Sequence, residues 1–395
     1  MIGFDEALAL LGEVARPLDR EAVALAAAHR RVLAAPVVAG LDAPATDTSA
    51  MDGYAVRDAD VAVLPARLRV IGESFAGRPF DGVVGAGECA RIFTGAAVPA
   101  GADRVIIQEI VRREDDVAVF GHALGGGRHI RPQGSDFRRG ERVLEAGRRL
   151  DPRAMVAAAG ADVAEVEVWT RPRVIVLGTG DELAPPGQAA RTPGAIPESV
   201  SFGVAGMAAD HGAEVIDRLR LPDDPATLEA AAAEALSRAD LVVVTGGASV
   251  GEKDYARSMF AAAGLDLIFS KVAIKPGKPV WLGRAKGRLV LGLPGNPTSA
   301  MVTARLFLAP LLAGLAGEPP AAALAWRPAP LAGDLPACGD RQTFHRASWG
   351  EGGVVPVGNQ DSSAQKALAA AEVLIRRRPG AAAAGAGVMV ETLAF

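Results

Sequence analysis

The chain has 395 residues, a formal net charge of −4 and an aromatic content of 5%. This length exceeds what one hydrophobic core supports, so we expect two to four domains. A small negative charge gives no general attraction to nucleic acid or to an anionic membrane surface. The scarcity of aromatic rings argues against base-stacking platforms. We therefore expect neither a nucleic acid nor a membrane as a partner.

The two cysteines and the N-terminus suggest a cytoplasmic protein. Cys89 and Cys338 lie far apart in the sequence, which predicts free thiols in a reducing compartment. The first residues lack a basic stretch followed by an apolar core, so no signal peptide is expected. No run approaches the ~20 apolar residues that a membrane span needs.

The first 170 residues change character twice. Apolar residues spaced three to four apart from Phe4, and an alanine-rich stretch from Glu21, predict helices across residues 4–40. Short β-type runs between glycine- and aspartate-rich turns predict a small β domain at residues 41–140. Residues 151–168 return to a helix and then an alternating strand. We expect residues 1–40 and 141–170 to form one helical and extended linker domain, with the β domain inserted into it.

Residues 171–317 alternate strands and helices. Strands are predicted at residues 173–177, 214–221, 240–244, 265–274 and 288–293, and helices at about 199–210, 225–238, 255–263 and 297–316. Asp224 before Pro225 is a strong helix start, because aspartate favours the capping position and proline the first helical position. This alternation predicts a doubly wound parallel sheet.

Residues 318–395 begin with a linker rich in alanine and proline. Short strands are then predicted around residues 341–349 and 387–393, which indicates a small, β-barrel-like C-terminal domain. The expected fold class is therefore multidomain α/β plus β: a doubly wound parallel-sheet domain, an inserted β domain, a linker domain and a C-terminal β domain.

Polar residues gather in the loops that follow the predicted strands of residues 171–317. Ligands bind beyond the carboxyl ends of the strands in an open parallel sheet, so these loops are where chemistry is expected. The candidate residues there are Asp181, Glu182, Gly246, Gly247, Ser249, Asp254, Lys275, Lys278, Pro294, Asn296, Pro297 and Ser299.

These loops fit an anion site with a bridging metal. Glycines let backbone N–H groups approach an anion, and the predicted helix starts at Asp254 and Asn296 add a favourable dipole. Four of the six lysines fall between residues 253 and 278 and add positive charge. Carboxylates beside phosphate suit Mg²⁺, and the candidates are Asp181, Glu182, Asp223 and Asp254. The alternative is that each loop only connects a strand to a helix. That explanation is adequate for any single loop, but it is the weaker one for four such loops at one edge of one sheet.

A second pattern in the same region indicates a different chemistry. Residues 247–251 match G-x-S-x-G between a strand and a helix, which is the context of a hydrolase nucleophile. Asp266 and His345 follow in the required order, but His345 falls in another predicted domain and no HGGG-type oxyanion loop is present. A serine hydrolase using Ser249 therefore stays as an alternative.

Outside this region the signals are weaker. The histidines lack metal-ligand spacing, and each is expected at the surface or at a cap (His29, His122, His129, His211 and His345). In the predicted β domain, residues 47–55 gather two acids and two hydroxyls around a glycine turn, which by itself is only a polar turn. Residues 91–96 and 134–136 are similar.

Taken together, these motifs resemble the molybdopterin molybdenumtransferase family, which includes MoeA and the gephyrin E domain. The resemblance covers nearly the whole chain, and Arg341-x-x-Phe344 and Gln360 with Ser362 also fit. Six motifs stand in family order: Ser49-Ala50-Met51-Asp52-Gly53-Tyr54-Ala55, Phe93-Thr94-Gly95-Ala96, Thr179-Gly180-Asp181-Glu182-Leu183, Gly246-Gly247-x-Ser249-Val250-Gly251 with Asp254, Lys275-Pro276-Gly277-Lys278-Pro279 and Gly292-Leu293-Pro294-Gly295-Asn296-Pro297.

The resemblance implies four domains, with the pterin bound by the parallel sheet of the third. It also implies a homodimer in which the second domain of one subunit faces the third domain of the other, so that Asp52 and Thr94 reach the neighbouring active site. Lys275 and Lys278 would hold phosphate or molybdate. The acidic groups would be Asp136, Glu182, Asp223 and Asp254, and the other oxyanion contacts would come from Gly246, Gly247, Ser249 and Ser299.

The implied reaction joins adenylylated molybdopterin and molybdate with release of AMP. Mg²⁺ on carboxylates would bridge the pyrophosphate, and the dithiolene sulfurs would displace oxo groups that leave as water. A molybdopterin adenylyltransferase is the partner expected to supply the substrate.

Three positions depart from the family pattern. Residues 196–200 replace an Asp-Ser-Asn segment, with Glu198 at the aspartate position. Gly178 stands where serine is frequent, and Glu372 stands where asparagine is common. These changes keep a second alternative open, a catalytically impaired pterin-binding or scaffold paralogue.

Overall fold

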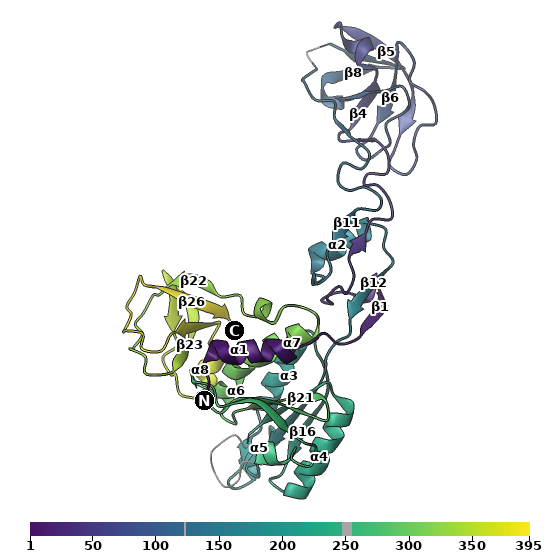
Figure 1. The fold of residues 1–395 in the computed structure, drawn as a ribbon. Coiled ribbons are helices and arrows are strands. Elements are labelled where there is room, and N and C mark those ends of the chain that lie inside the picture. The colour runs from purple at the N-terminus through teal and green to yellow at the C-terminus, as the bar shows by residue number, and fades with distance from the viewer. Residues whose placement is uncertain (122–123, 247–254) are drawn as a thin grey trace. The chain divides into compact units, whose positions relative to one another are not determined.

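The computed structural model of the chain describes residues 1–121, 124–246 and 255–395. It forms two compact units (Figure 1). Unit 1 contains Met1–Glu21, Arg30–Ala34 and Glu167–Phe395, and unit 2 contains Ala22–His29 and Ala35–Val166. The finer division into four domains remains a prediction.

Unit 1 is built on a six-stranded sheet with strand order β16, β13, β17, β21, β20, β18. The first four strands are parallel, and β20 is antiparallel to both of its neighbours. The sheet is therefore mixed, with the predicted parallel arrangement at its centre. The strands are Arg173–Thr179 (β13), Glu214–Leu221 (β16), Leu241–Thr245 (β17), Asp266–Ser270 (β18), Trp281–Ala285 (β20) and Arg288–Leu293 (β21).

Helices cover both faces of this sheet, which is why its central strands are apolar at nearly every position. Alternate residues of β13 point to opposite faces: Val176 packs on the side of α3, while Leu177 packs on the side of α4. Asp224 caps α4 as predicted, because its carboxylate accepts the Thr227 N–H at 2.8 Å. The helices are α3 (Val200–Asp210), α4 (Pro225–Arg238) and α5 (Tyr255–Ser258), which is shorter than predicted.

A long helix runs from Pro297 to Leu315, as α6 (Pro297–Thr303), a π-helical turn η5 (Ala304–Leu308) and α7 (Ala309–Leu315). Its 19 residues are long and apolar enough to cross a membrane by length and composition, so the expectation that no run approaches this size is wrong. The helix is 94% buried inside unit 1, as in the core of a globular domain. Arg305, within it, donates to the carbonyls of Ala394 and Ala323, and burial lowers its pKa to about 10.

The N-terminal helix α1 (Phe4–Val14) packs against the long helix and the C-terminal strands (Figure 1). The Phe4 ring makes edge contacts with Phe307 of the long helix and Phe344 of β23, at centroid distances of 5.7 and 5.1 Å. Arg376 lies over Phe4 and binds Asp5 at 2.7 Å. The first helix of the chain therefore joins the central sheet to the last strands.

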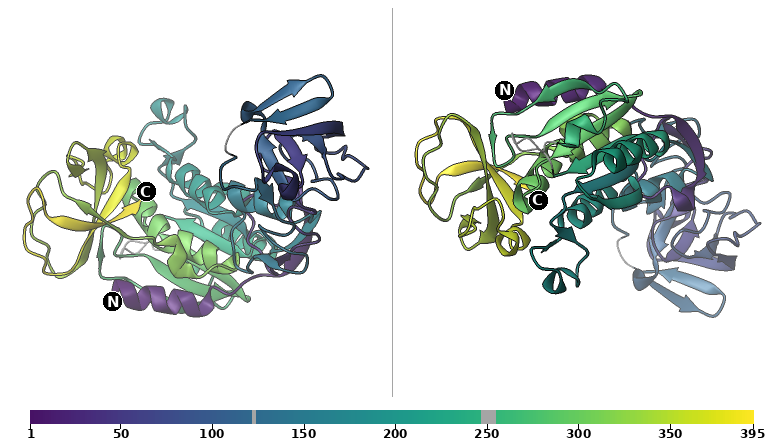
Figure 2. Two further views of the ribbon diagram at one scale, coloured as in Figure 1. Left: turned by 90° about the horizontal axis from the view of Figure 1, so that it is seen from above. Right: turned by 90° about the horizontal axis from the view of Figure 1, so that it is seen from below.

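The C-terminal part of unit 1 is a second six-stranded sheet, seen in yellow beside the central sheet in Figure 2. Its strand order is β19, β23, β25, β26, β22, and β24 also pairs with β23. The predicted strand at residues 265–274 is confirmed for β18 (Asp266–Ser270), but its end is a separate strand, β19, which joins this other sheet in parallel with β23. The strands are Ile274–Lys275 (β19), Arg327–Pro330 (β22), Gln342–Gly350 (β23), Gly353–Pro356 (β24), Val373–Arg377 (β25) and Met389–Ala394 (β26), with the short helix α8 at Gln365–Ala369.

Unit 2 contains the predicted β domain. Its six-stranded sheet has the order β7, β4, β6, β5, β9, β8, and its core includes Tyr54, Val56 and Phe120. The strands are Gly53–Val56 (β4), Ala66–Ser74 (β5), Glu88–Ile92 (β6), Arg104–Ile107 (β7), Val111–Glu114 (β8) and Val117–Phe120 (β9).

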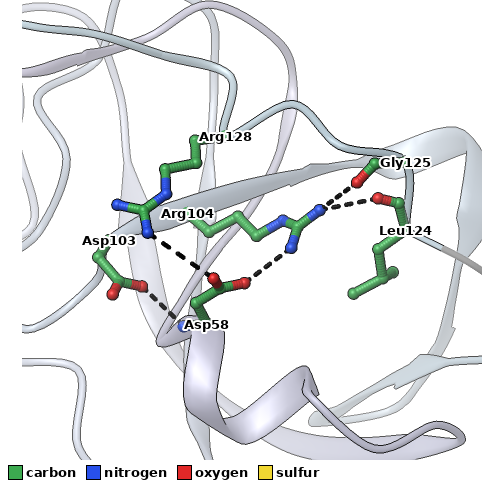
Figure 3. Close-up of polar contacts among 6 residues, drawn as sticks. All are labelled: Asp58, Asp103, Arg104, Leu124, Gly125 and Arg128. Carbon is green, nitrogen blue, oxygen red and sulfur yellow. Dashed lines mark hydrogen bonds and ion pairs between the residues drawn. The ribbon is translucent and has the colours of Figure 1, made fainter.

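A half-buried arginine fixes one end of this sheet (Figure 3). Arg104 of β7 binds Asp58 at 2.7 Å and donates to the carbonyls of Leu124 and Gly125. Asp58 also forms an ion pair with Arg128 at 3.9 Å, and its own N–H donates to Asp103. One guanidinium thus ties the segment after β9 to the start of β7.

The remaining elements are two-stranded pairs and one helix, α2 (Pro152–Gly160). The prediction of helices across residues 4–40 is confirmed only for α1. The alanine-rich stretch instead begins in β1 (Arg20–Ala24), which pairs with β12 (Glu165–Trp169), and continues as a 3₁₀ helix at Leu25–Ala27. In β1 strand pairing overrides the helix propensity of alanine. The other pairs are β2 (Val37–Val38) with β11 (Arg142–Leu144), β3 (Thr48–Ser49) with β10 (Ile130–Arg131), and β14 (Leu183–Ala184) with β15 (Ile196–Pro197).

His345 contradicts the expectation of a surface histidine, because it lies in β23 with 8% of its surface exposed. Burial, and then the positive charges of Arg377, Lys275 and Arg346, lower its pKa from 6.5 to about 4. Between these two pKa values His345 is protonated in the unfolded chain and neutral in the folded chain. The free energy of unfolding therefore falls as the pH drops through this window.

We expect His345→Gln to lose this part of the pH dependence. The free energy of unfolding should fall by up to about 3 kcal/mol less than in the parent protein between about pH 7 and pH 4.5. Urea unfolding at several pH values measures the difference, with the exposed His29→Gln as the control. Equal pH slopes for His345→Gln and the parent would contradict the assignment.

Candidate functional site

The carboxyl ends of β13, β17 and β21 open into a cleft of about 670 Å³ within unit 1. This is the sheet edge at which the sequence predicts ligand binding. Most of its lining comes from the central sheet domain: Thr179, Gly180, Glu182, Leu183, residues 196–200, Thr245, Gly246 and residues 294–297, with Asp223 and Pro279. Ser363 and Gln365, where α8 begins, complete it.

The predicted site residues fall into four groups. Six line the cleft: Glu182, Asp223, Gly246, Pro294, Asn296 and Pro297. Four belong to unit 1 and are not among its lining residues: Asp181, Lys275, Lys278 and Ser299. Three belong to unit 2: Asp52, Thr94 and Asp136. Gly247, Ser249 and Asp254 lie outside the described residues.

Glycines bring the strand ends into unusually close contact on the cleft floor. A Cβ atom on Gly246 would lie 2.5 Å from the Thr179 carbonyl, and one on Gly295 would lie 3.3 Å from the Gly246 Cα. Gly246 also has a φ of +98°, which side chains rarely adopt. At these positions the lining of the cleft therefore consists of backbone, packed too closely for side chains.

Thr179 adds a polar group to this floor. Its residue is 4% exposed, and its Oγ1 has no hydrogen-bond partner among the described residues. Because this oxygen is itself buried, it belongs to the packing beneath the floor of the cleft.

The acidic residues of the cleft are organised by neighbouring backbone. The Asp181 carboxylate accepts the Asp223 N–H at 3.0 Å, so it holds two loops together. A Cβ atom on Gly180 would lie 2.6 Å from Glu182 Oε2, so the Glu182 carboxylate folds back over a position that only glycine leaves open. In the described parts of the chain, no three acidic, histidine or cysteine residues are grouped as a metal site.

Glu198 is an acid of the cleft that the sequence marks only as a departure. It is 5% exposed, and its two oxygens accept the Ser201 N–H at 2.8 Å and the Ser201 hydroxyl at 2.6 Å. Arg218 approaches it at 3.8 Å. This carboxylate is thus held in place at the start of α3 and faces the cleft.

A loop of the C-terminal domain forms one rim of the cleft. The Asn296 side chain donates to the Ser362 hydroxyl at 2.9 Å, and the Ser362 carbonyl accepts the Thr298 N–H at 3.0 Å. Buried Arg346 joins the same parts, because it donates to the Thr298 hydroxyl and to the Asp361 carbonyl. Ser363 and Gln365 also line the cleft, and no motif in the sequence predicts this.

The two predicted lysines occupy different surroundings from those expected. Lys275 lies in β19, where its backbone pairs with Thr343, and its side chain is exposed. Lys278 is also exposed, and its carbonyl accepts the Val272 N–H. Neither lysine is among the residues that line the cleft, whereas Pro279, which follows Lys278 in the sequence, is.

In unit 2 the structure brings together two predicted residues that are far apart in sequence. The Asp52 carboxylate accepts the Thr94 N–H at 2.7 Å and the Thr94 hydroxyl at 2.8 Å. These two hydrogen bonds hold the pKa of Asp52 below its ordinary value, and the bond from the backbone N–H has the larger effect. Asp136 is exposed, and its N–H donates to the Ala43 carbonyl.

The hydrolase arrangement gains no support from the described residues. His345 is buried in the C-terminal sheet and Asp266 is exposed in β18, and no described hydrogen bond joins them. Ser249 lies outside the described residues.

Three family descriptions match consecutive parts of the chain. Residues 2–161 match the MoeA N-terminal region (domain I and II), and residues 175–314 match a probable molybdopterin binding domain. Residues 328–395 match the MoeA C-terminal region (domain IV).

Individual proteins show the same similarity. The molybdopterin molybdenumtransferase of Haemophilus influenzae is 38% identical over 80% of this chain and 78% of its own length. That of Nostoc sp. is 36% identical over 76% and 70%. The crystal structure of the molybdopterin biosynthesis moeA protein from Pyrococcus horikoshii OT3 superposes with a TM-score of 0.86, at 28% identity and over 100% of both chains.

We expect Thr94→Val to raise the pKa of Asp52 while leaving it below its ordinary value, because the backbone N–H remains and only the hydroxyl is lost. Carbon NMR of aspartate-labelled protein across a pH titration measures the change. Thr192→Val, in unit 1, is the control. An unchanged Asp52 titration in Thr94→Val would show that the pair does not form in solution.

Proposed function

The chain belongs to the MoeA family of molybdopterin molybdenumtransferases, and we propose that its cleft inserts molybdate into adenylylated molybdopterin with release of AMP, within molybdenum cofactor biosynthesis. The observation that carries the proposal is the cleft itself. It lies at the carboxyl edge of a parallel sheet, its volume suits a nucleotide-sized ligand, and its floor is glycine backbone beside two acids.

The cleft floor suits the phosphates. Gly246 and Gly295 line the cleft without side chains, and the long helix begins at Pro297, which also lines it. Lys275 and Lys278, with Ser249 and Ser299, are the proposed additional contacts to phosphate or molybdate.

The proposed metal is Mg²⁺, and the described acids fit it in a particular way. Glu182 and Asp223 line one cleft but form no three-ligand cage on their own. Mg²⁺ is commonly bound by one or two carboxylates together with substrate phosphates, so this donor set suits a metal that arrives with its substrate. Glu182 and Asp223, with Asp181 and Asp254, would hold it, and it would neutralise the pyrophosphate charge.

The chemistry then requires proton transfer to oxygen. Each dithiolene sulfur that bonds to molybdenum displaces one oxo group, and that oxygen needs two protons to leave as water. Glu182 is the proposed relay, since it faces the cleft and has no salt bridge among the described residues. Hydrolysis of the phosphoanhydride adds one water and releases AMP, which makes the overall insertion effectively irreversible.

Unit 2 is proposed to complete the site from a second subunit. Asp52, Thr94 and Asp136 belong to unit 2, whereas the residues that line the cleft belong to unit 1. A homodimer would bring the Asp52–Thr94 pair of one subunit to the cleft of the other. A molybdopterin adenylyltransferase is the proposed source of the substrate.

We expect the purified protein to release AMP from adenylylated molybdopterin when Mg²⁺ and molybdate are both present. Glu182→Gln keeps the shape of the side chain but removes its acid, so the molybdate-dependent rate should fall by about a hundredfold or more. Nucleotide chromatography of timed samples measures AMP.

The control is Glu234→Gln, an exposed position on α4 that lies outside the cleft and pairs with Arg238. Its rate should match that of the parent protein. Binding of the substrate without AMP release, under molybdate and under tungstate, would overturn the catalytic proposal in favour of a pterin-binding or scaffold protein.

A further inference from the structure

The cleft has two chemically different halves. Glu198 and three apolar residues, Leu183, Ile196 and Val200, line one half, where the short strands β14 and β15 pair. Glycine backbone from Gly246 and Gly295 forms the other half. A ligand with a flat apolar body at one end and phosphates at the other would therefore find a matching surface for each end.

Beside Glu198 there is an open position in the sheet. Gly178 of β13 has no side chain, and a Cβ atom built on it would meet only oxygens: Thr245 Oγ1 at 3.6 Å, Glu198 Oε1 at 3.8 Å and the Leu219 carbonyl at 3.8 Å. These are ordinary contact distances, so one more heavy atom fits there without displacing a neighbour. We call this position, with Glu198 and Thr245, the acceptor recess.

The acceptor recess selects hydrogen-bond donors. A carboxylate has about four lone-pair positions, and Ser201 fills two of those on Glu198. The Leu219 carbonyl and the Thr245 hydroxyl add further acceptor capacity. Because Glu198 is 5% exposed, its unused capacity lies in a site of low dielectric, where a matching N–H group is bound strongly and a phosphate is repelled.

We propose that Glu198 and the open position at Gly178 recognise the amino-and-amide edge of the pterin ring. A 2-amino-4-oxopterin presents two adjacent N–H donors, which is the pattern that a carboxylate accepts in pairs. Leu183, Ile196 and Val200 then contact the ring, and the phosphates lie over Gly246 and Gly295. The carboxylate thereby sets the direction of the substrate in the cleft. This assignment rests on the proposed function for the identity of the ligand.

Two substitutions test the recess in different ways. Glu198→Gln keeps the size of the side chain but turns one acceptor into a donor, and Gly178→Ser fills the open position. Each should weaken the binding of molybdopterin by about tenfold or more and leave the binding of AMP unchanged. Anaerobic isothermal titration with molybdopterin and, separately, with AMP measures both affinities in the full-length protein.

Glu229→Gln, on the exposed side of α4, is the matched control and should bind both ligands as the parent does. Circular dichroism establishes that the variants are folded. If Glu198→Gln does not fold, Gly178→Ser still tests the proposal. Parent-like molybdopterin binding by the folded variants would overturn the proposal. So would an equal loss of molybdopterin and AMP, which would give Glu198 only a structural role.

The outcome is separable from that of the proposed function. If the parent protein releases no AMP but the two variants lose molybdopterin selectively, the recess is supported and the catalytic proposal fails. If the parent releases AMP and the variants bind molybdopterin normally, the catalytic proposal is supported and the recess fails.

Discussion

The cleft depends on one apolar core that joins three distant parts of the sequence. Phe4 of α1, Phe307 of the long helix and Phe344 of β23 meet in it, together with Val176 of the central sheet. Apolar burial of this extent is the main stabilising contribution in a folded domain. Because the core includes both the helix that starts at the cleft and the C-terminal strands, it also holds the rim loop around Ser362 against the strand ends.

Close backbone contact is the second constraint. Gly246 and Gly295 approach Thr179 and each other so closely that a side chain on Gly246 would collide with the Thr179 carbonyl. That packing leaves peptide groups as the floor of the cleft. In the proposed function an anion binds over this backbone, although two acids, Glu182 and Asp223, line the same cleft.

Charge is arranged unevenly along the cleft. Glu198 is buried, fixed by Ser201 and balanced only by Arg218 at 3.8 Å, while the backbone half carries no described side-chain charge at its floor. A substrate with anionic and donor-rich ends is therefore oriented before any chemistry begins. In this way the departures at Gly178 and Glu198 become parts of one feature, because the space at the first lies beside the carboxylate of the second.

The sequence by itself determined the parallel strands of the central sheet, the Asp224 cap and the sheet edge that carries the cleft, because each depends on local patterning: apolar runs, caps and glycine loops. It failed where a distant partner decides the structure. The alanine-rich residues after Glu21 favour a helix locally but pair with β12, and Lys275 leaves the central sheet because β23 offers an unpaired edge. Only the tertiary structure could place Glu198, Ser363 and Gln365 at one cleft, because the sequence around each of them does not indicate which other segments it will contact.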